Sequence, residues 1–339
     1  MNKLAAFATA AAFAAATAQT AIAGTTWRLS HWVPAANPVQ TLGLEPWAKS
    51  IEAATEGRLK IEIYPAQQLG AAPDHYDMVR DGIAQIGWVA PGYEPGRFPV
   101  HELPELPFHA TDAIQAAAAI KEWYMPIAER EMPEIFYCLS FPHDPGGLHT
   151  KMPVHVPGDL KGRNIRAGTA TMARYVALVG GVSVRVPVPE AREAIARGLA
   201  DGLTFPWGSL QIFGIEKETP YHLDAPFYIA PQAVLINRAA LDGLPEEDRQ
   251  VVLDHCTPDW SSQITRGWAE VEMAGRERLR NDPAHTAYVP TEAELAEWKA
   301  STLPLLDEWK AAVTARGEDA DAIYQSWLDA LDRHGVLMK

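Results

Sequence analysis

The sequence repeats one pattern of short strands and amphipathic helices in two separate stretches. In the first stretch, strands are expected over residues 26–31, 59–64 and 86–89, with helices over 39–56 and 74–81 between them. In the second, strands are expected over 164–166, 182–186 and 202–205, with helices over 171–179 and 189–198. Strands that alternate with helices form sheets covered by helices on both faces. The pattern therefore predicts an α/β protein with two lobes and a cleft between them.

The N-terminus has the three parts of a secretory signal peptide. Lys3 supplies a positive charge, residues 4–18 are almost entirely apolar, and Ala21-Ile22-Ala23 has the small-x-small form that signal peptidase reads. We therefore expect residues 1–23 to be removed, with Gly24 as the first residue of the mature protein. The apolar run is shorter than the roughly 18 residues that a membrane-spanning helix needs. We expect a periplasmic protein with no direct insertion into the membrane.

Charge and motif content exclude several classes of function. The formal net charge is −14, and no block of Lys and Arg offers a surface for nucleic acid. A ligand that is itself an anion needs one specific buried cation to overcome this negative charge. The sequence has no G-x-S-x-G, H-E-x-x-H, P-loop or G-x-G-x-x-G motif. We therefore expect no catalytic residues, no cofactor and no metal ligands. A periplasmic hydrolase or lyase is the enzyme alternative, and a sensory adaptor is a third class.

Two cysteines, Cys138 and Cys256, lie far apart in the sequence. An oxidising compartment permits a disulfide between them, but two cysteines in a chain this large do not make a disulfide framework. Two buried thiols are an equally good interpretation. Neither cysteine has C-x-x-C spacing, so we expect neither a redox site nor a zinc site.

Three segments carry a resemblance to a known family. Residues 64–70 read Tyr-Pro-Ala-Gln-Gln-Leu-Gly, and Asp81-Gly82 precedes the next strand. Residues 159–166 read Asp-Leu-Lys-Gly-Arg-Asn-Ile-Arg. The third segment runs from Glu190 through Ala194-Ile195 to Gly198 and Asp201-Gly202. In this order and spacing, the segments resemble the solute receptors of tripartite ATP-independent periplasmic (TRAP) transporters, the DctP-like family, over essentially the whole mature chain.

The resemblance implies a non-enzymatic receptor with the two-lobed periplasmic-binding-protein fold. Each lobe would be a sheet flanked by helices, braced by long C-terminal helices that are expected over residues 261–280, 292–316 and 319–332. Lobe 1 is expected to comprise residues 24–147 with about 236–280, and lobe 2 residues 148–235 with about 281–339. The lobes would close around a small organic acid and deliver it to the TRAP membrane permease subunits.

Arg166 is the binding residue that the resemblance implies most directly. It ends a strand just before Gly168-Thr169, where a helix begins. Family members place the arginine at this position in the cleft, where it binds the ligand carboxylate through two parallel hydrogen bonds. A guanidinium suits this role because its planar donors match two carboxylate oxygens and it stays charged. The alternative is an arginine that pairs with a surface acid, and Arg163 and Arg185 are expected to be surface residues.

Aromatic residues are expected to form the rest of the pocket. Many relatives carry Asn where this chain has Phe205, and sialic-acid binders have an arginine where it has Tyr93. The other candidates are Trp207, Trp88, His149 and Trp32. Aromatic rings supply large apolar area and stacking surfaces, although some of these residues belong to the core if the usual burial preference applies. We therefore expect a carboxylate with an aromatic or apolar body. A C4-dicarboxylate, a sugar acid and an ectoine- or betaine-like zwitterion stay open as alternatives, as does a co-bound cation.

Overall fold

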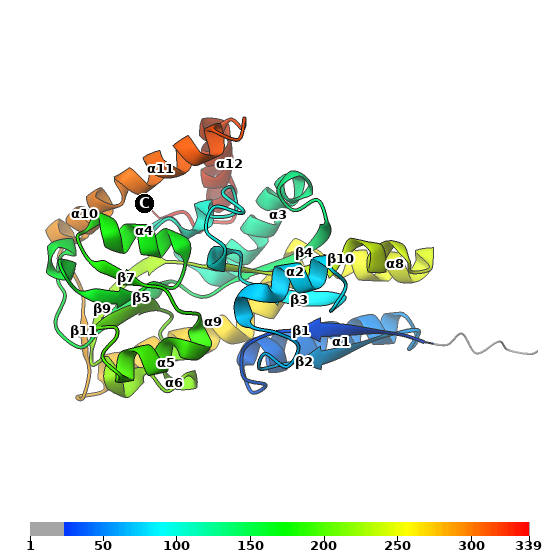
Figure 1. The fold of residues 1–339 in the computed structure, drawn as a ribbon, viewed down its shortest axis with the longest axis horizontal. Helices are drawn as coiled ribbons and strands as arrows, with labels where there is room; N and C mark the ends of the chain where they lie inside the picture. The colour runs from blue at the N-terminus through cyan, green and yellow to red at the C-terminus, as the bar shows by residue number, and fades with distance from the viewer. Residues whose placement is uncertain (1–23, 339) are drawn as a thin grey trace, which may run out of the picture.

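Two β-sheets form the centre of the molecule, and a computed structural model describes residues 24–338 (Figure 1). The expected signal peptide, residues 1–23, lies outside the described part of the chain. The first sheet has the strand order β2-β1-β3-β10-β4, and the second has the order β11-β9-β5-β8-β6-β7. The two-lobed α/β architecture expected from the sequence is thereby confirmed. Among residues 24–338, no helix is both long and apolar enough to cross a membrane.

The first sheet is built mainly from the first stretch of alternating elements. Its strands are β1 (Thr25–Ser30), β2 (Leu59–Tyr64), β3 (Ile86–Val89), β4 (Ile135–Pro142) and β10 (Pro231–Asn237). Strands β1, β2 and β3 run parallel, and β10 pairs antiparallel with both β3 and β4. The accompanying helices are α1 (Glu45–Ala54), α2 (His75–Arg80), α3 (Ala113–Glu131), α7 (Arg238–Asp242) and α8 (Glu246–Asp254).

The second sheet contains the second stretch. Its strands are β5 (Gly146–Thr150), β6 (Asn164–Arg166), β7 (Val182–Val184), β8 (Gly202–Phe205), β9 (Tyr221–Tyr228) and β11 (Thr286–Tyr288). Strands β7, β6 and β8 run parallel, whereas β5 is antiparallel to both β8 and β9. The helices beside this sheet are α4 (Ala170–Leu178), α5 (Val188–Ala196) and α6 (Ser209–Ile212). These strands are short but stable because both faces of the sheet are covered, as the complete burial of Leu203 and Ile165 indicates.

Two adjacent segments carry the chain between the sheets. Strand β4 leads through residues 143–145 into β5, and β9 leads through residues 229–230 into β10. The segments lie side by side, because Pro142 pairs with Pro231 and Gly146 pairs with Tyr228. Residues 231–235, which the sequence analysis placed with the second lobe, therefore pair in the first sheet. A hinge motion of the lobes would change the backbone conformation of these crossing segments.

A third connection between the lobes is the long helix α9 (Pro258–Asn281). It packs on α3 and β4 beside the first sheet and reaches α6 and β11 beside the second. Figure 1 shows this helix running from the middle of the molecule towards the lower left, past α6, while the C-terminal helices cross at the top of the view. They are α10 (Glu292–Ser301), α11 (Leu303–Thr314) and α12 (Ala320–Arg333).

Tryptophan side chains attach the C-terminal helices to both lobes. The indole N–H of Trp298 donates to the backbone carbonyl of His155 in the second lobe (2.8 Å). The indole N–H of Trp309 donates to the carbonyl of Pro99 in the first lobe (2.7 Å). Both rings are buried in one apolar cluster that includes residues of α3 and α4. The C-terminal helices therefore brace the two lobes through a shared core.

Two expected helices are divided in the structure. The helix expected over residues 292–316 is two helices, α10 and α11, and Pro304 lies in the first turn of α11. The helix expected over residues 39–56 begins as a π-helical turn, Val39–Leu44, before α1 starts with Pro46 in its first turn. In both places proline lacks the backbone N–H that would continue the preceding helical hydrogen bonds, so a new helix starts there.

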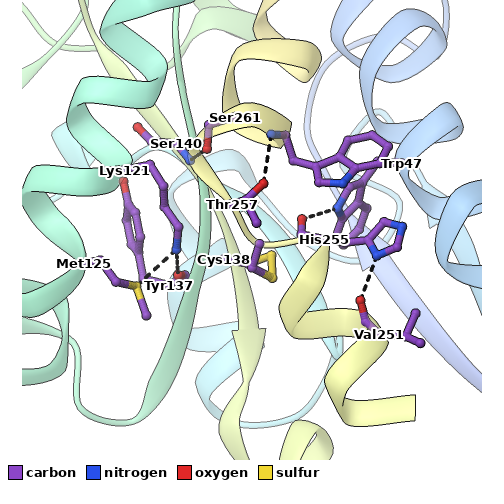
Figure 2. Close-up of a disulfide and its surroundings, with 12 residues drawn as sticks. Trp47, Lys121, Met125, Tyr137, Cys138, Ser140, Val251, His255, Thr257 and Ser261 are labelled. Atoms are coloured by element: carbon purple, nitrogen blue, oxygen red, sulfur yellow. Dashed lines mark hydrogen bonds between the residues drawn. A yellow bond between two sulfur atoms is a disulfide. The ribbon is translucent and has the colours of Figure 1, made fainter. Parts of the chain in front are cut away.

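A disulfide joins Cys138 to Cys256, which settles the question that the sequence left open (Figure 2). Cys138 lies on β4, and Cys256 lies between α8 and α9. Next to the bridge, the indole N–H of Trp47 donates to the backbone carbonyl of His255 (2.8 Å). The disulfide thus ties the start of α9 to the first sheet.

Candidate functional site

A cleft lies between the lobes, where strands from both sheets end. It holds about 570 Å³ of empty space, counting the part that opens to solvent. Trp32 follows β1 and Tyr93 follows β3 from the first lobe, while Arg166 ends β6 and Phe205 ends β8 from the second. The carboxyl ends of parallel strands are where α/β proteins bind ligands. The volume is in the range of a small-molecule pocket.

The Arg166 guanidinium lines this cleft and has no ion-pair partner among the described residues. Its side chain is fully buried, and its Nε donates to the backbone carbonyl of Val186 (3.0 Å). The two terminal nitrogens, Nη1 and Nη2, form no hydrogen bond of good geometry with the described residues, although the Tyr93 hydroxyl lies close enough to interact with this guanidinium. The guanidinium carbon lies 5.8 Å from the centre of the Phe205 ring. Because a buried charge without a partner is costly, this arrangement favours an anion in the cleft.

The N-terminus of helix α4 reinforces the positive potential next to Arg166. Gly168 and Thr169 line the cleft just before the helix begins. The side chain of Thr169 caps the helix by accepting from the backbone N–H of Met172 (3.2 Å), and the N–H of Gly168 donates to Thr204 Oγ1 (2.9 Å). A helix N-terminus carries partial positive charge, so it favours the same anionic group.

Aromatic rings form the apolar walls. The centre of the Trp32 ring lies 5.2 Å from that of Trp88 and 5.8 Å from that of Tyr93. Trp88 also lies 6.2 Å from Trp268 of helix α9. Such offset and tilted pairs are favourable beyond their buried area. The walls can therefore hold a flat, apolar body next to the Arg166 guanidinium.

Tyr93 links the lobes at the edge of the cleft. Its hydroxyl accepts a hydrogen bond from the backbone N–H of Val188, at the start of α5 in the second lobe (3.1 Å). Burial raises the pKa of Tyr93, so the phenol stays neutral. Beside it, an added Cβ at Gly92 would lie 2.2 Å from a carboxyl oxygen of Glu105 and 3.0 Å from Thr169 of the second lobe. Glycine at position 92 thus permits the close approach of the two lobes.

Glu105 is a buried carboxyl group next to this contact. Burial, together with the negative charge of Glu102 nearby, raises the pKa of Glu105 to about 8. Glu102 in turn forms an ion pair with Arg174 of α4 in the second lobe (2.5 Å). The group that faces the interlobe contact is therefore an uncharged acid at neutral pH, and a charged pair lies behind it.

The structure brings five of the seven candidate residues together. Arg166, Phe205, Trp88, Tyr93 and Trp32 all line the cleft. Their role in ligand binding stays a prediction, since no ligand contact is part of this geometry.

Trp207 and His149 lie outside the cleft, behind Phe205. Their rings pack edge to face, 4.9 Å apart, and both are buried. His149 donates from Nε2 to the backbone carbonyl of Phe205 (2.9 Å), and its Nδ1 lies 2.8 Å from Nδ1 of His222. Burial lowers the pKa of His149 to about 4, so the ring is neutral. These residues hold the end of β8 in place.

Several residues that line the cleft were not predicted from the sequence. They come from the first crossing segment, from the adjoining ends of β9 and β10, from α6 and from α9: His143, Tyr228, Gln232, Ser209 and Trp268. Gln232 accepts the indole N–H of Trp88 (3.2 Å) through Oε1, which fixes that wall. None of them follows a motif, and only their position at a change of sheet could have pointed to them.

One group outside the cleft has the composition of a metal site. Ligand atoms of Glu216, Asp282 and His285 lie within 4.8 Å of one another. However, the guanidinium of Arg278 donates to both carboxylate oxygens of Glu216, at 2.7 and 2.6 Å. These oxygens are already neutralised, so we assign no metal to this group.

The chain is similar to known solute-binding proteins in both sequence and structure. The sequence matches the family model described as bacterial extracellular solute-binding protein, family 7, over residues 29–312. A marine metagenome TRAP solute binding protein specific for aromatic acid ligands, in complex with metahydroxyphenylacetate, is 28% identical. It has a TM-score of 0.85, and the match covers 91% of this chain and 99% of that one.

Two further structures are equally similar. A TRAP solute binding protein from Rhodoferax ferrireducens in complex with copurified benzoate is 26% identical, with a TM-score of 0.86 and coverage of 92% of this chain and 98% of that one. A TRAP periplasmic solute binding protein from Bordetella bronchiseptica with bound (R)- and (S)-mandelate is 27% identical. Its TM-score is 0.85, and the match covers 91% of this chain and 99% of that one.

Proposed function

Because this chain belongs to the bacterial extracellular solute-binding proteins of family 7 and is a TRAP solute-binding protein, we propose that its ligand is an aromatic monocarboxylate. The ligand carboxylate binds Arg166, and the aromatic body lies between the rings of the cleft. Closure of the lobes over the ligand then gives the form that docks on the TRAP membrane permease. We assign the protein no catalytic step.

The two terminal nitrogens of the Arg166 guanidinium carry this proposal. Two buried N–H donor groups without partners match the two oxygens of one carboxylate. The large side chains of the remaining lining are mostly Trp, Tyr and Phe. Three similar structures hold hydroxyphenylacetate, benzoate and mandelate, which are aromatic monocarboxylates.

The charge of the cleft disfavours the other organic acids. Among the described residues that line it, Arg166 is the one charged side chain, because burial lowers the pKa of His143 to about 4. A C4-dicarboxylate would leave its second carboxylate buried without a cation. A sugar acid would bury hydroxyl groups against aromatic rings that cannot accept or donate enough hydrogen bonds. A betaine-like zwitterion fits the aromatic walls and is the second ligand class to test.

We also propose that the protein acts in the periplasm after removal of residues 1–23. The family is extracytoplasmic, and the N-terminal sequence has the form of a signal peptide. The Cys138–Cys256 bridge is compatible with an oxidising compartment.

A thermal-shift screen of the ligand-stripped mature protein tests the ligand class. The screen compares benzoate, phenylacetate and mandelate with C4-dicarboxylates, sugar acids and betaines. A ligand at about 1,000 times its dissociation constant stabilises the protein by roughly 4 kcal/mol. We expect the large shifts to be confined to aromatic carboxylates. Shifts from sugar acids or dicarboxylates alone would contradict the aromatic pocket and leave the receptor function intact.

Tyr93→Phe tests the contact between the lobes. Loss of the hydroxyl leaves the Val188 N–H without its acceptor when the lobes are together, so binding should weaken by about three- to tenfold. Calorimetry with benzoate measures this change. Tyr64→Phe, which removes a hydroxyl on the first sheet away from the cleft, is the matched control. An affinity within twofold of wild type for Tyr93→Phe would show that the hydrogen bond does not contribute to closure.

A further inference from the structure

Among the described residues that line the cleft, one fully buried side-chain acceptor has no partner, and a plain aromatic carboxylate cannot satisfy it. His143 lies in the first crossing segment and is buried, with 4% of its surface exposed. It packs edge to face against Tyr228, 4.9 Å between ring centres, and against Trp268, 5.9 Å. Its Nε2 has no hydrogen-bond partner among the described residues, although the ring lines the cleft. A buried polar atom without a partner is costly unless a ligand supplies one.

The tautomer of His143 follows from its other nitrogen. Nδ1 lies 2.7 Å from the backbone carbonyl of Asp144, and a carbonyl oxygen can only accept. Nδ1 therefore carries the proton and donates it to that carbonyl. Burial lowers the pKa of His143 to about 4, so the ring is neutral at pH 7. In a neutral imidazole the second nitrogen is then an acceptor, and Nε2 offers a lone pair to the cleft.

Among the described residues that line the cleft, the other fully buried side-chain atoms without a partner are donors. They are Nη1 and Nη2 of Arg166 and the indole Nε1 of Trp32. Carboxylate oxygens can satisfy donors, but an ionised carboxylate has no hydrogen to give to His143. A ligand that satisfies all of these buried atoms must therefore carry a hydrogen-bond donor in addition to its carboxylate.

Building on the proposed function, we propose that the cleft selects hydroxylated aromatic acids, and that Nε2 of His143 accepts the hydroxyl proton of the ligand. The hydroxyl is a phenol on the ring or an alcohol on the side chain. His143 is the specificity-determining residue, whereas Arg166 binds the carboxylate common to all aromatic acids. A site with a buried acceptor discriminates strongly against analogues that lack the donor.

Matched ligands test this inference on the wild-type protein. Calorimetry compares benzoate and phenylacetate with their meta- and para-hydroxy derivatives and with mandelate. The corresponding methoxy acids are the control, because a methyl ether keeps the oxygen but cannot donate. At least one hydroxy acid should bind about tenfold more tightly than both its parent and its methoxy analogue. Equal affinities within each set would overturn the inference while leaving the proposed function standing.

The His143→Phe variant tests whether the preference for hydroxy acids depends on this side chain. Phenylalanine keeps the edge-to-face packing and removes the acceptor, so the ratio of parent to hydroxy-acid dissociation constants should fall to about threefold or less. His101→Phe is the matched control, because His101 is a buried neutral histidine outside the cleft whose pKa burial lowers to about 3. A His143→Phe protein that keeps the full preference contradicts the inference. A wild-type protein that binds none of these acids overturns the proposed function, and this inference with it.

Discussion

Replacing Arg166 with alanine should abolish most of the binding of aromatic carboxylates. The ligand carboxylate would then be buried between apolar rings without a counter-charge, which costs about 3 kcal/mol or more and weakens binding by at least about a hundredfold. Arg166→Lys keeps the charge but loses the planar pair of donors, so its affinity should lie between those of the alanine variant and the wild type. Calorimetry with benzoate or its hydroxy derivatives measures both changes.

A different substitution at position 166, Arg166→Met, distinguishes an effect on ligand binding from an effect on stability. In this conformation, Nη1 and Nη2 of Arg166 are buried with no hydrogen-bond partner among the described residues, so the charged side chain does not stabilise the fold that contains it. Arg166→Met should therefore melt at the same temperature as the ligand-free wild type or higher, although it does not bind. Arg163→Ala, which removes an exposed arginine from the same segment, is the control and should bind normally. A loss of less than tenfold in affinity for Arg166→Ala would contradict the carboxylate role.

Removing the disulfide should cause the largest loss of stability. Cys138 and Cys256 are 118 residues apart in the sequence, so the bridge closes a long loop in the unfolded chain. Chain-entropy arguments give about 3 to 5 kcal/mol for a loop of this length. The double variant Cys138→Ala/Cys256→Ala should therefore melt roughly 10 °C below the oxidised wild type.

Two measurements check the bridge independently of the variant. Titration of the denatured, unreduced wild type should find no free thiol, because the sequence has two cysteines and both are in the bridge. Reduction of the wild type should lower its melting temperature towards that of the double variant. Two titratable thiols, or a double variant that melts within about 2 °C of wild type, would argue that the bridge does not form in the folded protein.

The alternating pattern of the sequence predicted the strands that position the cleft. Strands β2, β3, β6 and β8 begin and end where the sequence placed them, because each is a short segment that lies between predicted helices and is preceded or opened by glycine. The position of Arg166 at the end of β6 and before a helix followed from the same pattern. The family resemblance then supplied the reason to place it in a cleft.

The sequence did not predict which of the aromatic residues line the cleft. Phe205 and Trp207 are two residues apart, and in an extended strand they would share a face. Strand β8 ends at Phe205, and the chain turns at Pro206, so Trp207 points into the core beside His149 instead. Trp268 and His143 line the cleft because α9 and the first crossing segment pass beneath it. No local pattern in the sequence predicts that these two side chains line the cleft.

The sequence by itself determined the two α/β lobes, the type of their elements and the strand-end arginine, since these follow from hydrophobic period and local backbone chemistry. The tertiary structure alone decided the disulfide, the faces that the aromatic rings present, and the unpaired atoms of Arg166 and His143. These features depend on contacts between segments that lie far apart in the chain. A side chain becomes a binding group only when folding removes its alternative partners, and that removal is a property of the packed molecule.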